Sequence, residues 1–121
     1  MTFGPGEVDP SQPLGGGSPA RRVPVTFSRR EISRILDLYG RKVAAGEWRD
    51  YAIEFLKDRA VFCVFRRSSE VPLYRIEKNP KLERRQGAYS VISQTGLIVR
   101  RGRELDRVLR AIDRSLAVVA N

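Results

Sequence analysis

Arginine is the residue whose spacing in this sequence points most directly to a chemistry. Two runs of arginine recur at intervals of three, four or seven residues, which place each run on one face of a helix. The run near the C-terminus consists of Arg103, Arg107, Arg110 and Arg114. The earlier run consists of Arg30, Arg34 and Arg41. Because a guanidinium is a planar fork of donors that matches phosphate oxygens, we predict two solvent-facing arginine ridges, each able to contact a polyanion.

A second group of basic residues falls on the segments that connect the expected strands. Residues 57–85 contain nine basic side chains and four acidic ones. The basic residues singled out on the connections are Arg66, Arg67, Lys78, Lys81, Arg84, Arg85, Arg100 and Arg101. Loops on a rigid scaffold often carry function, and Tyr74 or Tyr89 beside them would allow a base to stack. These connections are therefore candidates for binding a nucleic-acid backbone.

The charge balance agrees with a polyanionic partner. The 121 residues include 23 Lys and Arg against 14 Asp and Glu, and residues 21–121 hold all 23 bases with 12 of the acids, a net charge of +11. Asp106 and Asp113, however, lie three or four positions from arginines of the last run, and such pairs stabilise a solvated helix face by about 0.2–0.5 kcal/mol each. Both interpretations of the ridges stay open. The leading hypothesis is a small basic binding module that contacts nucleic acid or another polyanion.

The residue types that are missing exclude several kinds of enzyme. The sequence has no His and a single Cys, which rules out a Ser-His-Asp triad, a Cys-His dyad, a His-containing zinc site and a thiolate metal cage. Glu54 and Glu77 form a candidate acid–base pair, but alternation places them on polar strand faces, where ion pairs are expected. We therefore expect no catalytic residue, no metal, no cofactor and no enzyme. A small enzyme for an anionic substrate, with Arg49, Arg66 and Arg75 as clamps, is a third hypothesis.

A polar and aromatic cluster follows the first expected helix. It consists of Trp48, Arg49, Asp50 and Tyr51. We interpret it mainly as a packing corner, in which Arg49 and Asp50 are candidates for recognising a partner. The alternative function is a protein-interaction or assembly module that forms a homo-oligomer through this corner or a sheet edge, with no nucleic-acid role. Such a module is expected to expose an apolar patch of several hundred Å2.

Capping signals and helical spacing define two helices. Ser28 followed by Glu31 is a capping box, apolar residues then follow at helical spacing, and Gly46 supplies a left-handed stop. A second amphipathic helix is expected from about Arg103 to Val119. Both helices require a sheet or another helix against which to bury their apolar stripes.

The sequence between the helices alternates with the period of a strand. A three-strand meander is expected from Trp48 to Lys78, and a hairpin over residues 88–100. Val23–Phe27 is interpreted as an edge strand because it contains Pro24. The predicted fold is α+β with two layers: a mainly antiparallel sheet of five to six strands packed with two amphipathic helices. The sheet would be mixed if the first strand made a parallel crossover.

Residues 1–21 are rich in Gly and Pro and are expected to form a disordered tail, which leaves residues 22–121 as one domain. The chain shows neither a basic-then-apolar secretory signal at its start nor a run of about 18 apolar residues. A cytoplasmic protein with no membrane contact is therefore expected.

Two segments of the sequence resemble a known family: GEWRDYAI at residues 46–53 and PLYRIEK at residues 72–78. Over about residues 23–115 the chain resembles a small alphaproteobacterial family filed as a domain of unknown function. The resemblance implies a bacterial cytosolic protein with a single folded domain. It implies no activity, cofactor or catalytic residue.

Overall fold

The computed structural model describes residues 23–67 and 71–120, with side chains as far as Asp113. The tail predicted over residues 1–21 therefore lies outside the described residues, and so does the guanidinium of Arg114.

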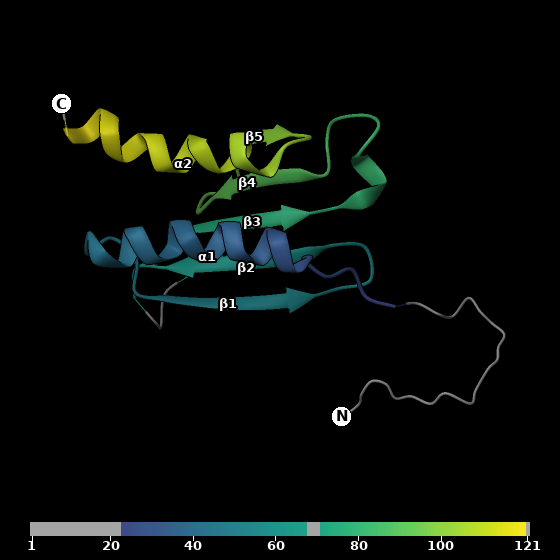
Figure 1. Ribbon diagram of the computed structural model, residues 1–121, viewed down its shortest axis with the longest axis horizontal. Coiled ribbons are helices and arrows are strands. Elements are labelled where there is room, and N and C mark those ends of the chain that lie inside the picture. The colour runs from purple at the N-terminus through teal and green to yellow at the C-terminus, as the bar shows by residue number, and fades with distance from the viewer. Residues whose placement is uncertain (1–22, 68–70, 121) are drawn as a thin grey trace, which may run out of the picture.

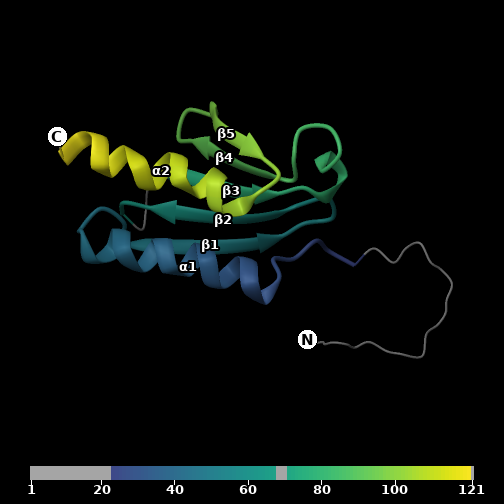
Figure 2. The same ribbon diagram turned by 45° about the horizontal axis from the view of Figure 1, so that its top comes forward.

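The described chain folds into one five-stranded sheet with two helices on a single face (Figures 1 and 2). The strands are β1 (Asp50–Phe55), β2 (Ala60–Phe65), β3 (Tyr74–Lys78), β4 (Tyr89–Ser93) and β5 (Ile98–Gly102). Their order in the sheet is their order in the chain, and every neighbouring pair is antiparallel. The helices are α1 (Arg29–Ala44) and α2 (Leu105–Ala120), and a short 3-10 helix, η3 (Pro80–Leu82), follows β3. The predicted two-layer α+β class is confirmed.

The edge strand predicted over Val23–Phe27 does not form. Val25 donates its N–H to the carbonyl of Leu56 at 2.9 Å, but residues 23–28 adopt no strand. Pro24 has no N–H to donate, and Phe27 turns into the core directly before the helix begins, so too few residues remain for a ladder. Without that strand there is no parallel crossover. The sheet of the described residues is antiparallel rather than mixed.

Helix α1 begins at the predicted capping box. The Ser28 hydroxyl accepts the N–H of Glu31 at 3.1 Å, and the Glu31 carboxylate accepts the N–H of Ser28 at 2.7 Å. At the other end the chain leaves the helix through Gly46, whose φ is +78°. A cap of this kind contributes roughly 1 kcal/mol. Because the cap defines where α1 starts, it also defines where the Glu31 side chain lies.

The core lies between the helices and one face of the sheet. The sheet residues at its centre are Phe62, Val64, Ile76 and Val91. The helix residues packed on them are Ile35, Leu38, Val108 and Ile112. Burying each such side chain stabilises the fold by about 1.5–3 kcal/mol. On the opposite face, which no helix of the described chain covers, Val61 and Cys63 are buried beneath neighbouring strand side chains such as Arg75 and Glu77.

The loop between β3 and β4, residues 79–88, folds back against the junction of β5 and α2. Asn79 donates its N–H to the carbonyl of Ala88 at 2.7 Å, which closes the loop. Gly87 has a φ of +97°, and a Cβ at this position would lie 2.1 Å from the carbonyl carbon of Gly102 and 2.6 Å from the nitrogen of Arg103. Only glycine permits this approach. The loop and the junction are thus held together at the end of the sheet where both helices begin (Figure 1).

Candidate polyanion-binding site

One corner of the molecule gathers an excess of basic side chains. It is built from the loop of residues 79–88, the end of β5 and the start of α2 (Figure 1). We call this surface the basic corner, and its basic residues are Lys81, Arg84, Arg85, Arg100, Arg101, Arg103 and Arg107. Its acidic residues are Glu83 and Glu104, since Asp106 in the first turn of α2 faces α1 and pairs with Arg34 there. Seven positive charges therefore lie beside two negative ones.

Arg103 attaches the loop to the rest of the basic corner. Its Nε and Nη2 donate to the backbone carbonyls of Glu83 and Arg84 at 3.1 and 3.0 Å. Nη1 of Arg101 likewise donates to the side-chain oxygen of Gln86. All three acceptors are neutral, so these bonds position both guanidiniums without cancelling their charge. They join segments that are 15 to 20 positions apart in the sequence.

Most of the charge at the basic corner is not compensated. The exposed members that form no ion pair with a described carboxylate are Lys81, Arg84, Arg85, Arg100 and Arg103. Nε of Arg107 lies 3.3 Å from Glu104, but both side chains are about two-thirds exposed, and such a pair contributes about 0–1 kcal/mol. With Arg100, Arg101 and Arg103, Arg107 also lines a shallow hollow of about 270 Å3. The corner can therefore take anionic oxygens from several directions.

The two arginine ridges predicted on the helices do not form one solvent-facing platform. Helices α1 and α2 lie side by side (Figure 2). Ion pairs cross between them. Nη1 of Arg34 lies 3.4 Å from Asp106, and Nη2 of Arg41 donates to Asp113 at 3.0 Å. The local spacing suggested that these acids pair with arginines of their own helix. In the structure each acid pairs instead with an arginine of the other helix. The ridge residues without an ion pair among the described side chains are Arg30, Arg103 and Arg110.

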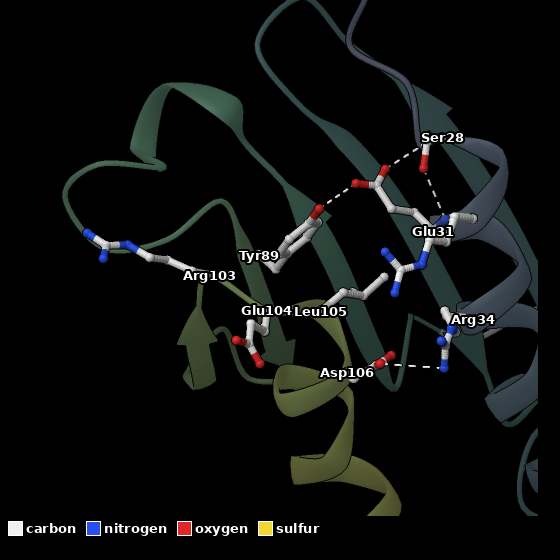
Figure 3. Close-up of a pocket in the computed structure, with 9 residues that line it drawn as sticks. Ser28, Glu31, Arg34, Tyr89, Arg103, Glu104, Leu105 and Asp106 are labelled. Carbon is white, nitrogen blue, oxygen red and sulfur yellow. Dashed lines mark hydrogen bonds and ion pairs between the residues drawn. The ribbon is translucent and has the colours of Figure 1, made fainter.

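A partly buried network at the start of α1 is absent from the sequence predictions. The Glu31 carboxylate accepts a hydrogen bond from Lys78 Nζ at 2.8 Å. It also accepts one from the Tyr89 hydroxyl, in addition to the bond from Ser28 (Figure 3). Burial raises the pKa of Glu31, but these hydrogen bonds outweigh burial and hold the pKa below its ordinary 4.5. Burial, together with the bond to Glu31, raises the pKa of Tyr89 above its ordinary 10. The capping box locates Glu31, but its other partners lie 47 and 58 positions away.

The same network lines a hollow of about 310 Å3 between the first turns of the two helices (Figure 3). Three arginines line it, Arg30, Arg34 and Arg103. Three carboxylates also line it, those of Glu31, Glu104 and Asp106. Arg103 points away from this hollow toward the loop (Figure 3). Because the carboxylates offset the arginines, the hollow suits an anion less well than the basic corner does.

Three of the predicted basic residues lie at the opposite end of the sheet. Arg49, Arg66 and Arg67 line a hollow of about 470 Å3 with Trp48, close to where α1 ends. Strand β2 ends here, whereas the basic corner lies where β3 and β5 end. The structure therefore separates these arginines from the basic corner.

The aromatic cluster after α1 is largely part of the core. Trp48 is 2% exposed, and its ring lies 6.4 Å from that of Tyr74. Asp50 accepts the N–H of Tyr51 at 2.8 Å, and the Tyr51 ring stacks on Phe62 at 4.9 Å. The arrangement is that of a packing corner, although Tyr51 and Arg49 remain exposed.

The carboxylates considered for catalysis are held in ion pairs or stand alone. Glu77 lies between Arg59 and Arg75, with Nε to oxygen distances of 3.6 and 3.4 Å. Arg75 therefore pairs with Glu77 rather than with Glu54, which is exposed on β1. The described residues contain no group of three or more His, Cys, Asp or Glu side chains that could hold a metal ion. Within the same part of the chain, no helix has the length and apolarity needed to cross a bilayer.

The fold and site define a two-layer α+β domain with a group of seven basic and two acidic side chains at one corner. The chain belongs to the family described as "Protein of unknown function (DUF2794)", whose model matches residues 25–109. This match confirms the resemblance to a family of unknown function. Neither the curated proteins nor the solved structures contain a significant match.

Proposed function

We propose that this domain is a non-catalytic module that binds nucleic acid through the basic corner. The observation that carries the proposal is the attachment of residues 79–88 to the β5–α2 junction by Arg103. This attachment turns two basic segments, separate in the sequence, into one surface with seven bases and two acids. The chain as a whole carries a net charge of +9, which adds long-range attraction for a polyanion.

The contacts expected are with phosphates rather than with base edges. Guanidinium groups bind phosphate oxygens through paired, charge-assisted hydrogen bonds. The positive ends of both helix dipoles lie at the same end of the sheet as the basic corner. Backbone contacts carry no sequence information, and each one releases a counterion. We therefore expect an affinity that varies little with sequence and falls steeply as salt rises.

Replacing Arg84 and Arg85 together by glutamine tests the basic corner. Both residues are exposed and lack ion pairs among the described side chains, so the free energy of unfolding is expected to change by less than about 0.5 kcal/mol. For a duplex oligonucleotide, the slope of log K against log salt is expected to become shallower by about 1–2. Fluorescence anisotropy across ionic strength measures this slope.

The matched control is Arg49→Gln with Arg66→Gln, which removes the same charge at the opposite end of the sheet. This pair is expected to leave the slope almost unchanged. Equal losses from both double variants would show that net charge alone drives binding, and would overturn the proposal. Wild-type binding no tighter than that of an unrelated protein of equal net charge would do the same.

Removing the carboxylates of the two interhelical ion pairs tests how much these pairs contribute to stability and binding. Asp106→Asn combined with Asp113→Asn leaves Arg34 and Arg41 without carboxylates. Because these pairs are about half exposed, their loss is expected to lower the free energy of unfolding by only about 0.2–1 kcal/mol each. Because Arg34 and Arg41 lie outside the basic corner, the salt slope for duplex binding is expected to stay almost unchanged. A slope steeper by about 2 in the same anisotropy titration would show that binding extends over the helices, and would contradict this expectation.

Assembly with a second copy, the alternative function suggested by the sequence, does not compete with nucleic-acid binding at the basic corner. Exposed apolar side chains lie on β1 and α1 and also on β5, where Ile98 and Val99 are exposed, but only the β1 edge lies away from the basic corner.

A further inference from the structure

An apolar surface runs along the edge strand β1 and the adjoining flank of α1. Arg34 and Arg41 lie on the opposite flank of α1 and pair with α2. The flank that adjoins β1 therefore faces away from α2. We call the surface the apolar edge, and it consists of Leu36, Tyr39, Val43, Tyr51, Ile53 and Phe55. Tyr39 and Tyr51 join the helix to the strand, with ring centroids 4.9 Å apart. The exposed fractions of four members, Leu36, Val43, Tyr51 and Phe55, are 38–48%.

The two edges of the sheet are protected differently. Strand β5 has a register shift opposite Val91 and Ile92, and it carries Arg100 and Arg101. Bulges and basic side chains are devices that keep edge strands from pairing with other chains. Strand β1 has neither: its register with β2 is continuous, and its sequence DYAIEF contains no Pro, Lys or Arg. Val25 reaches this edge only beyond the strand, at Leu56.

We infer that a second copy of this chain pairs with β1, antiparallel and edge to edge, so that two five-stranded sheets join into one. Directly opposite residues of an antiparallel pair lie on the same face of the sheet. When two copies of β1 pair about a two-fold axis, the axis must therefore pass beside one residue, which lies opposite itself in the second copy. Centring on Ile53 places Tyr51 opposite Phe55 of the second copy, on the helix side of the sheet. Centring on Ala52 would place Asp50 opposite Glu54, and like charges in that position are destabilising. The Ile53 register is therefore favoured.

The occupant is a second copy because the apolar edge complements itself. In the Ile53 register its aromatic side chains face one another across the two-fold axis, and Glu54 lies opposite the small Ala52. Such a contact uses the same surface on both chains and therefore closes. Both outer edges of the joined sheet are then β5 strands, whose arginines and bulge oppose further growth. The assembly is expected to stop at two copies.

Analytical ultracentrifugation over a range of concentrations tests the pairing. The wild-type chain is expected to approach twice 13.7 kDa as concentration rises. Leu36→Lys with Phe55→Lys places four ammonium groups at the interface and is expected to raise the dimer dissociation constant at least about tenfold. The control, Leu97→Lys with Ile98→Lys, makes the same change at exposed positions of the β5 edge and is expected to leave the constant unchanged. Thermal melting verifies that both variants fold.

A cysteine cross-link tests the register. Ile53→Cys in a Cys63→Ser background brings two thiols together on the two-fold axis, so mild oxidation is expected to give a covalent dimer. Glu54→Cys in the same background has Ala52 opposite it and is expected to cross-link poorly. A monomer at every concentration, a dimer weakened only by the β5 variant, or preferential cross-linking at residue 54 would each overturn the inference. None of these measurements involves nucleic acid, so the inference stands or falls separately from the function proposed above.

Discussion

Replacing Gly87 by alanine is expected to destabilise the protein by about 3 kcal/mol. Two costs combine at this position. The φ of +97° is unfavourable for any residue with a Cβ, and that Cβ would lie 2.1 Å from the carbonyl carbon of Gly102. The opposing atoms are backbone, so they cannot be relieved by rotating a side chain. Urea unfolding measures the loss, and the melting temperature is expected to fall by roughly 12 °C or more.

Gly96 provides the control for this substitution. It lies in the turn between β4 and β5 with a φ of +94°, yet a Cβ there would meet no atom within 4 Å. Gly96→Ala therefore carries the cost of the backbone conformation alone, about 1 kcal/mol. Similar losses for the two variants would show that residue 87 does not closely approach the β5–α2 junction. Because that approach helps to hold the loop of the basic corner, Gly87→Ala is also expected to weaken nucleic-acid binding in the fraction that remains folded.

Glu31→Gln is expected to be the second most damaging change, at about 2 kcal/mol. The amide retains the size of the side chain but removes the charge that pairs with Lys78 at 2.8 Å. Glu31 and Lys78 are only 14% and 19% exposed, so water compensates poorly for the lost pair. An amide oxygen also cannot replace both carboxylate oxygens as the acceptor for Ser28, Lys78 and Tyr89. Urea unfolding near neutral pH measures this loss.

The pH dependence of stability separates a role in charge from a role in packing. The folded-state pKa of Glu31 lies below the unfolded value of 4.5, so its contribution is present above that pH and is lost as pH falls through the folded pKa. Tyr89 has the opposite sign: its pKa is raised above 10, so its contribution is present below pH 10 and is lost as pH rises beyond it.

Unfolding measured as a function of pH therefore gives a specific signature for Glu31. Glu31→Gln is expected to flatten the fall in stability on the acid side of pH 4.5. Glu54→Gln, at an exposed carboxylate with no ion pair among the described residues, is expected to leave that fall in place. If the free energy of unfolding of Glu31→Gln fell as steeply below pH 4.5 as that of the wild type, protonation of Glu31 would not contribute to the pH dependence of stability.

The elements of this fold are largely readable from neighbouring residues. Ser28 and Glu31 identify the start of α1 because a capping box requires contacts only three positions apart. Strict alternation in β1 and the apolar run of β2 identify strands because side chains alternate between faces at every residue. Pro24 misled the same reasoning at the N-terminal segment. Proline is compatible with an edge strand, but a strand forms only where enough neighbouring residues make ladder hydrogen bonds. In this segment Val25 makes one such bond, to Leu56, and no strand forms.

The sequence by itself determined the α+β class, the two helices, the excess of arginine and the chemistries excluded by the missing histidine. Only the tertiary structure decided which arginines remain uncompensated. Asp106 and Asp113 have arginines within one turn of their own helix, but the packing of α1 against α2 brings Arg34 and Arg41 to them instead. The packing of residues 79–88 against the β5–α2 junction likewise joins Arg103 to the loop carrying Arg84. Spacing along a helix specifies a face, whereas the partner of a charge depends on which other segment packs against that face.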